Sequence, residues 1–316
     1  MARVARYSHL CALGRKGGRL LFGLLSLLLV GVTSPPPRTD RGAWIHFEPG
    51  FSLGVFDAPR KPEKGDGKIR ILRIDPARFA LRIFCASDPT EGKLHSARAW
   101  AKRHGLLAAT NTSMYQKDFR TSVSLLRSST HVNNPRLTRD NAILAFDPIV
   151  PGIPLVRILD RACDDFQVWT KRYASLVQSI RMYSCTGKNV WQQQPEKKWS
   201  HSAIGTDKGG NVLFIHVRSP YTTHDLIEML VSLPIDLDRL MYTEGGGEAQ
   251  LFIQHGEETF EFLGIDEAPL PFLGSRDHPI PNVIGVIRRQ RSPGSPALQE
   301  GTPSPSESGG GRESKP

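Results

Sequence analysis

MYTEGGGEAQLFI, residues 241–253, places three consecutive glycines between two apolar runs that are typical of strands. Glycine loses more conformational freedom on folding than any other residue, so three in a row are expected where the backbone needs positive φ or where a ligand approaches closely. The carboxylates Glu244 and Glu248 flank Gly245, Gly246 and Gly247. Successive backbone N–H groups in such a turn can bind an anion. A hairpin turn or bulge with solvated glutamates explains the pattern equally well.

Outward from this stretch, strand-like and helix-like segments alternate. Two turns are typical of hairpins: Asp75-Pro76, and residues 207–210 with the sequence DKGG. Strands are predicted at 69–74, 79–85, 106–110, 141–146, 203–205, 212–217, 240–242, 249–253 and 283–287, and helices at 94–104 and 225–233. The second helix has a capping-box-like start at Thr222 and Asp225, and Gly105 is a natural stop for the first. We therefore expect an α/β protein of the mixed α+β kind: one domain, 42–290, with a mostly antiparallel or mixed sheet, several hairpins and flanking helices.

The order of features in residues 241–253 resembles the C-terminal signature of the phosphodiester glycosidase domain family. That signature is a strand, an acidic residue, three glycines, a small or polar residue and a second strand. That family includes the lysosomal uncovering enzyme and many bacterial envelope proteins. Other segments are similar to family motifs in the expected order: residues 111–115 (NTSMY), Gln178-Ser179, residues 201–205 (HSAIG) and residues 279–286 (PIPNVIGV). The resemblance covers about residues 69–289. It departs from the family pattern at four positions, namely Ser113 for Gly, His201 for a basic residue, Glu244 for Asp and Glu248 for Ser.

The resemblance implies a hydrolase without a cofactor that cleaves the glycosidic C–O bond of a sugar linked through phosphate, or a related envelope glycan. Glu244 is then expected to activate water or stabilise the sugar cation, and Glu248 to orient the substrate. His201 is a third catalytic candidate. The expected substrate-binding residues are Asn111, Arg120, Ser202, Gly245, Gly246 and Gly247, with Arg120 and His201 directed at phosphate. A surface salt bridge is the alternative for Arg120. A glycan-binding or envelope-organising module without activity, and a peptidoglycan glycosidase that needs no phosphate, are the alternative functions.

The first 33 residues have the order of a secretory leader. Five basic residues and no acidic one precede an uncharged apolar run at 20–32. That run reaches only ~20 Å as a helix, short of the ~30 Å hydrocarbon core, so it suits a signal peptide better than a stable span. An uncleaved anchor through residues 20–32 is the alternative, because prolines follow the small residues directly. We expect export to the periplasm or the medium, a Pro-rich linker at 34–41 and a disordered tail at 291–316.

Half of the formal charge of +10 belongs to this leader, which leaves a mildly basic body. Such a surface suits phosphate-bearing substrates or an anionic envelope. Basic runs interleaved with aromatic residues are absent from the sequence, which argues against nucleic-acid binding.

Cysteine usage fits an oxidising compartment. Cys11 lies in the leader, and Cys163–Cys185 is the pair that we expect to be bridged. Cys85 lies in an apolar run and is expected to be a buried thiol, with a nucleophile as the less favoured reading. The sequence has no CxxC or HExxH spacing, so no dedicated metal site is predicted. His216, which alternates with apolar residues, is expected to be structural, and residues 131–134 are expected to form a turn.

Overall fold

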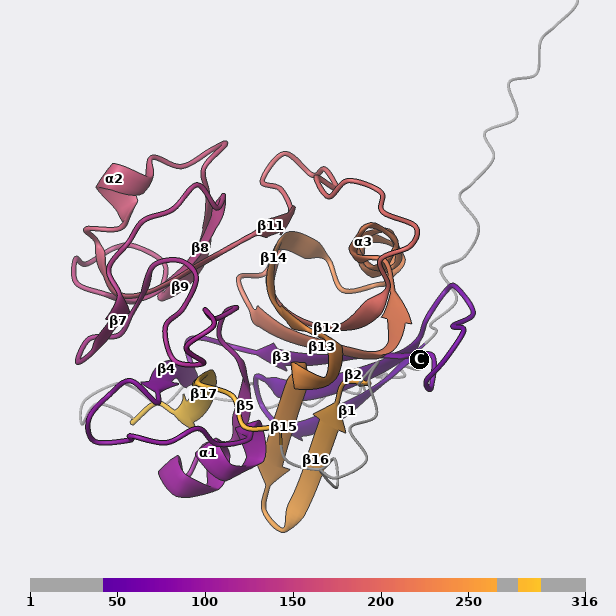
Figure 1. Ribbon diagram of the computed structural model, residues 1–316, viewed down its shortest axis with the longest axis horizontal. Helices are drawn as coiled ribbons and strands as arrows, with labels where there is room; N and C mark the ends of the chain where they lie inside the picture. The colour runs from indigo at the N-terminus through magenta and orange to yellow at the C-terminus, as the bar shows by residue number, and fades with distance from the viewer. Residues whose placement is uncertain (1–41, 266–277, 291–316) are drawn as a thin grey trace, which may run out of the picture. The chain divides into compact units, whose positions relative to one another are not determined.

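The computed structural model describes residues 42–265 and 278–290, so the predicted leader, linker and tail all lie outside the described residues. Strands dominate, and this part of the chain contains three α-helices (Figure 1). Within the same residues, none of the helices is long and apolar enough to cross a bilayer. The expectation of a mixed α+β protein is confirmed in its coarser form, as a molecule of antiparallel sheets with few helices.

The first sheet has seven strands in the order β1-β2-β3-β13-β12-β14-β11, and every neighbouring pair is antiparallel. Its hairpin at 207–210 is confirmed, because β12 and β13 pair directly. The strands are β1 (Gly42–Glu48), β2 (Phe51–Asp57), β3 (Lys68–Ile74), β11 (Arg181–Tyr183), β12 (Trp199–Asp207), β13 (Val212–Tyr221) and β14 (Leu237–Gly245).

Two five-stranded antiparallel sheets complete the fold. The second sheet runs β16-β15-β5-β17-β4, with bounds β4 (Phe79–Cys85), β5 (Ala108–Asn111), β15 (Gln250–His255), β16 (Glu258–Leu263) and β17 (Asn282–Arg288). The third runs β7-β6-β10-β8-β9, with bounds β6 (Leu126–Arg127), β7 (Val132–Asn134), β8 (Ala142–Pro148), β9 (Val156–Asp160) and β10 (Tyr173–Ser179).

The hairpin predicted at Asp75-Pro76 is wrong. β3 pairs with β2 and β13 in the first sheet, whereas β4 pairs with β17 in the second. The turn therefore carries the chain from one sheet to another. Gly50 accepts a hydrogen bond from the Asp75 N–H, and Asp75 in turn accepts bonds from the N–H groups of Arg78 and Phe79.

The ends of the two predicted helices are capped by residues that their sequences suggest. In α1 (Ala97–His104) the Ser96 hydroxyl accepts from the Ala99 N–H, and Gly105 ends the helix at φ 61°. The helix predicted over 225–233 is α3 (Thr223–Ser232), where Thr222 Oγ1 accepts from the Asp225 N–H at 3.1 Å. A single turn, α2 (Phe166–Trp169), is capped by Asp165.

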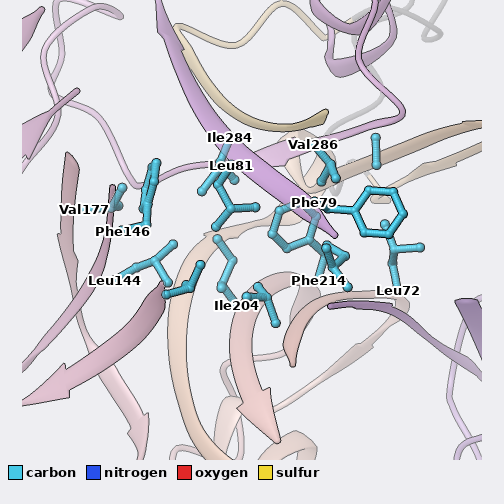
Figure 2. Packing of buried hydrophobic residues seen from close by; sticks show 14 of the residues in the cluster. Leu72, Phe79, Leu81, Leu144, Phe146, Val177, Ile204, Phe214, Ile284 and Val286 are labelled. Carbon is cyan, nitrogen blue, oxygen red and sulfur yellow. The ribbon is translucent and has the colours of Figure 1, made fainter. Parts of the chain in front are cut away.

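One buried apolar cluster draws side chains from all three sheets (Figure 2). Leu72 and Phe214 come from the first sheet, Phe79 and Ile284 from the second, and Phe146 from the third. Further clusters bury α3 against the first sheet and α1 against the second. The sheets are therefore held by a shared core, and α1 and α3 each cover a face of one sheet.

Candidate active site

The glycine-rich stretch is a crossing between two sheets. β14 ends at Gly245 in the first sheet, a single 3₁₀ turn spans Gly246–Glu248, and β15 starts at Gln250 in the second. The hairpin alternative is therefore wrong for these residues. A register shift between β12 and β14 falls immediately before the glycines, since Ser202 pairs with Glu244 but Ala203 pairs with Tyr242. Such bulges re-aim side chains and are frequent beside active sites.

Two of the three glycines are required by the geometry. A Cβ on Gly245 would lie 2.2 Å from Tyr242 Oη and 2.7 Å from Trp199 Cδ1, so no side chain fits there. Gly246 adopts φ 66°, the left-handed region that glycine tolerates without strain. The backbone thus makes its sharp turn directly between the two glutamates.

Glu244 and Glu248 are both partly buried at this crossing. Burial raises the pKa of Glu244 to about 8, and the negative charge of Glu248 adds to the effect, against a hydrogen bond from the Gly245 N–H. The Glu244 carboxyl is consequently protonated through much of the neutral range. Two carboxyl groups that influence each other in this way are the arrangement from which acid–base pairs are built.

Two tyrosines, Tyr115 and Tyr242, lie beside these glutamates, and the four side chains are called the glutamate cluster below. Burial, together with the neighbouring Glu248 carboxylate, raises the pKa of Tyr115. Burial and the charge of Glu244 raise the Tyr242 pKa. In the sequence, Tyr115 is the last residue of the motif at 111–115, and nothing there predicts its contact with Glu248. The neighbours of Tyr242 depend on the register shift between β12 and β14, which could not be predicted from the sequence.

Asn111 and Ser202 lie against the backbone of the crossing. The Asn111 amide donates to the Glu248 carbonyl at 2.9 Å, and its oxygen accepts from the Gln250 N–H at 2.7 Å. The Ser202 hydroxyl donates to the Gln250 carbonyl at 3.4 Å. Both side chains are buried. They tie β5 and β12 to the glycine segment and so fix the position of Glu248.

His201 pairs with Gly245 across the first sheet and is fully buried. Its Nε2 bonds Thr223 Oγ1 at 3.0 Å, and its ring contacts those of Trp199 and Tyr242. Burial lowers its pKa to about 3, so the imidazole is neutral at physiological pH. It therefore offers phosphate no positive charge, and its direct contacts are with the residues that surround Gly245.

Arg120 is exposed, and its guanidinium donates to the carbonyls of Ala86 and Gly92 at 3.0 and 3.1 Å. It holds the loop between β4 and α1 through the backbone. Both partners are backbone carbonyls, so these bonds are not the surface salt bridge that was the alternative for Arg120. Neither bond involves a residue of the glutamate cluster.

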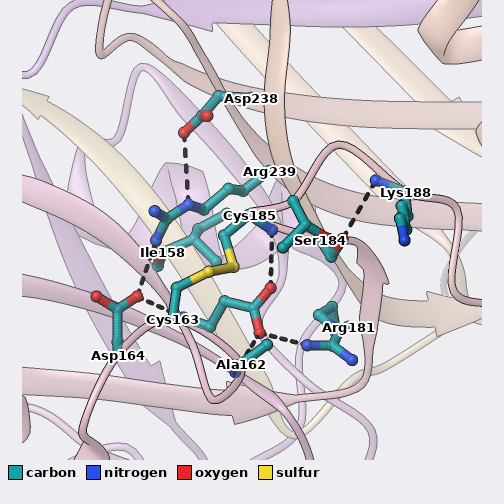
Figure 3. Close-up of a disulfide and its surroundings, with 12 residues drawn as sticks. Ile158, Ala162, Cys163, Asp164, Arg181, Ser184, Cys185, Lys188, Asp238 and Arg239 are labelled. Carbon is teal, nitrogen blue, oxygen red and sulfur yellow. Dashed lines mark hydrogen bonds and ion pairs between the residues drawn. A yellow bond between two sulfur atoms is a disulfide. The ribbon is translucent and has the colours of Figure 1, made fainter.

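The predicted disulfide between Cys163 and Cys185 is present (Figure 3). Cys85 is buried, as expected, and burial raises the pKa of its thiol to about 12. His216 is also structural: it is fully buried, and its Nε2 bonds the Ala249 carbonyl at 3.2 Å. The turn expected at residues 131–134 is wrong for three of them, because Val132–Asn134 form β7. His131 and Asn133 bond the Ser87 hydroxyl at 2.9 and 2.7 Å.

Two surface cavities, of about 360 and 370 Å³, are lined by residues other than those of the glutamate cluster. The first lies between α1 and the end of β15, and the second between β4 and the β6–β7 turn. Residues 42–265 and 278–290 hold no group of three or more histidine, cysteine or acidic side chains that could bind a metal ion.

Known proteins resemble this chain in sequence pattern and in fold. A family model described as phosphodiester glycosidase matches residues 104–287, which include the whole glutamate cluster. The catalytic domain of a zebrafish N-acetylglucosamine-1-phosphodiester α-N-acetylglucosaminidase, auto-inhibited by its pro-peptide, superposes with a TM-score of 0.54 at 12% identity, over 78% of this chain and 82% of that one. A hypothetical protein from Synechocystis gives 0.52 at 12% identity, over 81% of this chain and 64% of that one. At these identities the superpositions show the fold alone. No curated protein matches the sequence.

Proposed function

Because this chain belongs to the phosphodiester glycosidase family, we propose that it is an exported hydrolase that cleaves a glycosyl phosphate, a sugar joined through its anomeric carbon to a phosphodiester. The observation that carries the proposal is the meeting of Glu244 and Glu248 at the inter-sheet crossing, with the pKa of Glu244 raised to about 8.

In this reaction the bond between the anomeric carbon and the phosphate oxygen breaks, and the phosphate leaves with the bonding electrons. A water oxygen then bonds to the anomeric carbon and loses a proton. Phosphate is a good leaving group, so the site chiefly has to stabilise oxocarbenium character and manage the proton of the water.

Glu244 is the proposed acid–base residue. A group with a pKa near the working pH exchanges protons most effectively, and burial places Glu244 in that range. Its deprotonated form accepts the proton of the attacking water. Glu248, whose backbone carbonyl accepts a hydrogen bond from Asn111, is proposed to orient the sugar and stabilise its developing positive charge.

The remaining predicted residues take positioning or binding roles in the proposal. Asn111, Ser202 and neutral His201 support the backbone of the crossing. The N–H groups of residues 245–247 are proposed to face the substrate phosphate, as successive amides of such turns do. Arg120 is the predicted binder with the least support, since its guanidinium already bonds two backbone carbonyls.

Export is part of the proposal and rests on the leader-like sequence of residues 1–33 and on the disulfide. The name of the zebrafish relative identifies that enzyme's substrate as an N-acetylglucosamine-1-phosphodiester. We propose the same linkage class here, within an envelope glycan, and use it as the first probe.

The test compares the wild type with Glu244→Gln and Glu248→Gln on a panel of sugar phosphodiesters, with sugar release as the readout. We expect Glu244→Gln to lower kcat by about 10²- to 10⁴-fold, the usual contribution of a general acid–base group. Glu257→Gln, an exposed glutamate in the β15–β16 turn, is the matched control and should keep full activity.

Undiminished activity in Glu244→Gln would contradict the mechanism. An inactive wild type that still binds the panel would favour the glycan-binding module, and release from phosphate-free peptidoglycan fragments would favour the third function.

A further inference from the structure

An aromatic pair lies beside the glutamates, on the segment that joins β5 to β6. Tyr115 lies four residues after Asn111, whose amide donates to the Glu248 carbonyl at 2.9 Å. The Tyr115 ring contacts that of Phe119 at a centroid distance of 5.7 Å and an interplanar angle of 45°. Phe119 is 55% exposed. A large apolar side chain is thus displayed to solvent one ring away from a proposed catalytic carboxylate.

Phe119 is also held in an unfavourable backbone conformation. Its φ of 54° lies in the left-handed region, which a residue with a bulky side chain rarely occupies and which costs stability. Burial does not compensate for that cost, because the side chain is mostly exposed. Strain of this kind persists where the surrounding chain imposes it, and it clusters at ligand-binding sites.

The loop around Phe119 is held by several hydrogen bonds. Gln116 and Thr121 pair through a backbone bond of 2.7 Å, and the Phe119 N–H donates to the Gln116 carbonyl at 3.0 Å. The Asp118 carboxylate accepts from the N–H groups of Arg120 and Thr121 and from the Thr121 hydroxyl. These bonds fix the backbone from which Phe119 projects, and a loop ordered before binding lowers the entropic cost of binding.

We propose that Phe119, backed by Tyr115, forms a sugar-binding subsite in which the phenyl ring stacks on the C–H face of a pyranose. A neutral phenyl face provides dispersion and apolar contact but no hydrogen-bond donor for phosphate, so the subsite takes the sugar side of the substrate. This inference rests on the proposed function, since it places the sugar of that substrate between the glutamates and the β5–β6 loop that carries Phe119.

The test measures KM and kcat for a methyl phosphodiester of N-acetylglucosamine 1-phosphate. Phe119→Asn removes the ring and places at this position a residue that tolerates the left-handed conformation. We expect KM to rise about 3- to 10-fold, which is what the loss of one aromatic contact converts to, with kcat within twofold of wild type. Phe119→Tyr should restore the wild-type KM.

Thermal unfolding separates this role from a structural one. If the Phe119 ring binds the sugar and its backbone is strained, the melting temperature of Phe119→Asn should be no lower than that of wild type, while its KM should be higher. Val132→Ala, at a residue 54% exposed on β7, is the control and should change neither value. A lower melting temperature with kcat and KM both altered, or an unchanged KM, would overturn the inference.

Binding of N-acetylglucosamine 1-phosphate, followed by NMR titration, keeps this inference distinct from the proposed function. If the wild type hydrolyses nothing but its binding weakens in Phe119→Asn, the proposed reaction fails and the sugar subsite is supported. If the wild type hydrolyses the probe and Phe119→Asn equals it in both KM and binding, the subsite fails and the proposed function stands.

Discussion

Folding changes the protonation of Glu244. An ordinary glutamate with a pKa of 4.5 is ionised at neutral pH, whereas the folded protein raises the pKa of Glu244 to about 8. A carboxyl group whose pKa rises on folding contributes its full stability below the unfolded value, and that contribution is lost as the pH rises from 4.5 through 8. The folded state therefore gives up stability at neutral pH by burying this carboxyl group.

Glu244→Gln should consequently stabilise the protein at alkaline pH. Glutamine keeps the shape of the protonated acid and has no proton to lose, so the two proteins should unfold alike near pH 4.5. The variant should be more stable by roughly 1–3 kcal/mol at pH 8.5. Urea unfolding at both pH values measures the difference, with Glu257→Gln as the control. A difference that does not depend on pH would show that the Glu244 pKa is not raised.

Gly245→Ala tests how closely the chain packs at the same point. The new methyl group would lie 2.2 Å from Tyr242 Oη and 2.7 Å from Trp199 Cδ1, so the two aromatic side chains or the β14 backbone must shift. We expect a loss of about 1–3 kcal/mol in the free energy of unfolding, typical of overpacking, together with reduced activity because Glu244 moves with the strand.

A double-mutant cycle with Tyr242→Phe identifies the cause of that loss. Removing the hydroxyl should recover part of the stability of Gly245→Ala, because the shortest clash disappears, while the contact with Trp199 remains. Simple additivity of the two changes would contradict the proposed clash.

At the scale of elements, local signals predicted where strands and turns lie better than which strands pair. Residues 207–210 and Asp75-Pro76 both carry turn residues between apolar runs, yet only the first closes a hairpin. The glycine stretch likewise separates strands of different sheets. A turn motif fixes a change of direction over a few residues, whereas pairing depends on side chains far away in the sequence that fill the same core. The sequence could therefore not distinguish a hairpin from a crossing.

The disulfide is another element-scale feature with a predictable and an unpredictable part. Its pairing followed from the compartment and the position of the cysteines, but the ion-pair network around it did not. Asp160 accepts bonds from Arg181 and from the Cys185 N–H, and Asp164 pairs with Arg157. Asp164 also pairs with Arg239 (Figure 3). These bonds join β9, β11 and β14 and so connect the third sheet to the strand that ends at the glycines.

Replacing both Cys163 and Cys185 by serine should cost about 3 kcal/mol in the free energy of unfolding, because the bridge closes a loop with a sequence separation of 22 residues. Guanidinium unfolding of the variant measures this loss. Reduction of the wild type should reproduce it, since buried Cys85 takes no part in the bridge. Equal stability of the oxidised and reduced wild type would show that the ion pairs alone hold the strands together.

For the whole molecule, the sequence motifs predicted which segments lie close together better than they predicted the contacts of individual side chains. Asn111, His201, Glu244 and Glu248 do converge, because β5, β12 and the crossing meet where the first two sheets join. The roles of individual residues were harder to predict. Whether a polar side chain is free or bound to the backbone, as with Arg120, depends on neighbours that only the folded structure brings together.

Three groups contribute to the pH dependence of stability: two histidines destabilise the fold as the pH falls, and Glu244 stabilises it. His201 and His216 each have a pKa of about 3 in the folded state and 6.5 unfolded, so the unfolded chain gains protons as the pH falls below 6.5. Each histidine then costs about 1.4 kcal/mol per pH unit. Glu244 acts in the other direction, gaining stability as the pH falls from 8 to 4.5. For these groups together we expect a stability maximum near pH 6.5.

Urea midpoints from pH 4.5 to 8.5 locate this maximum, and two variants test its origin. Glu244→Gln should remove the decline on the alkaline side, because the variant lacks the titrating carboxyl group. His216→Asn keeps a donor for the Ala249 carbonyl and should reduce the acid-side slope by about 1.4 kcal/mol per pH unit. An acid-side slope identical in wild type and His216→Asn would mean that His216 titrates freely in the folded protein, which its complete burial beneath the β14–β15 crossing argues against.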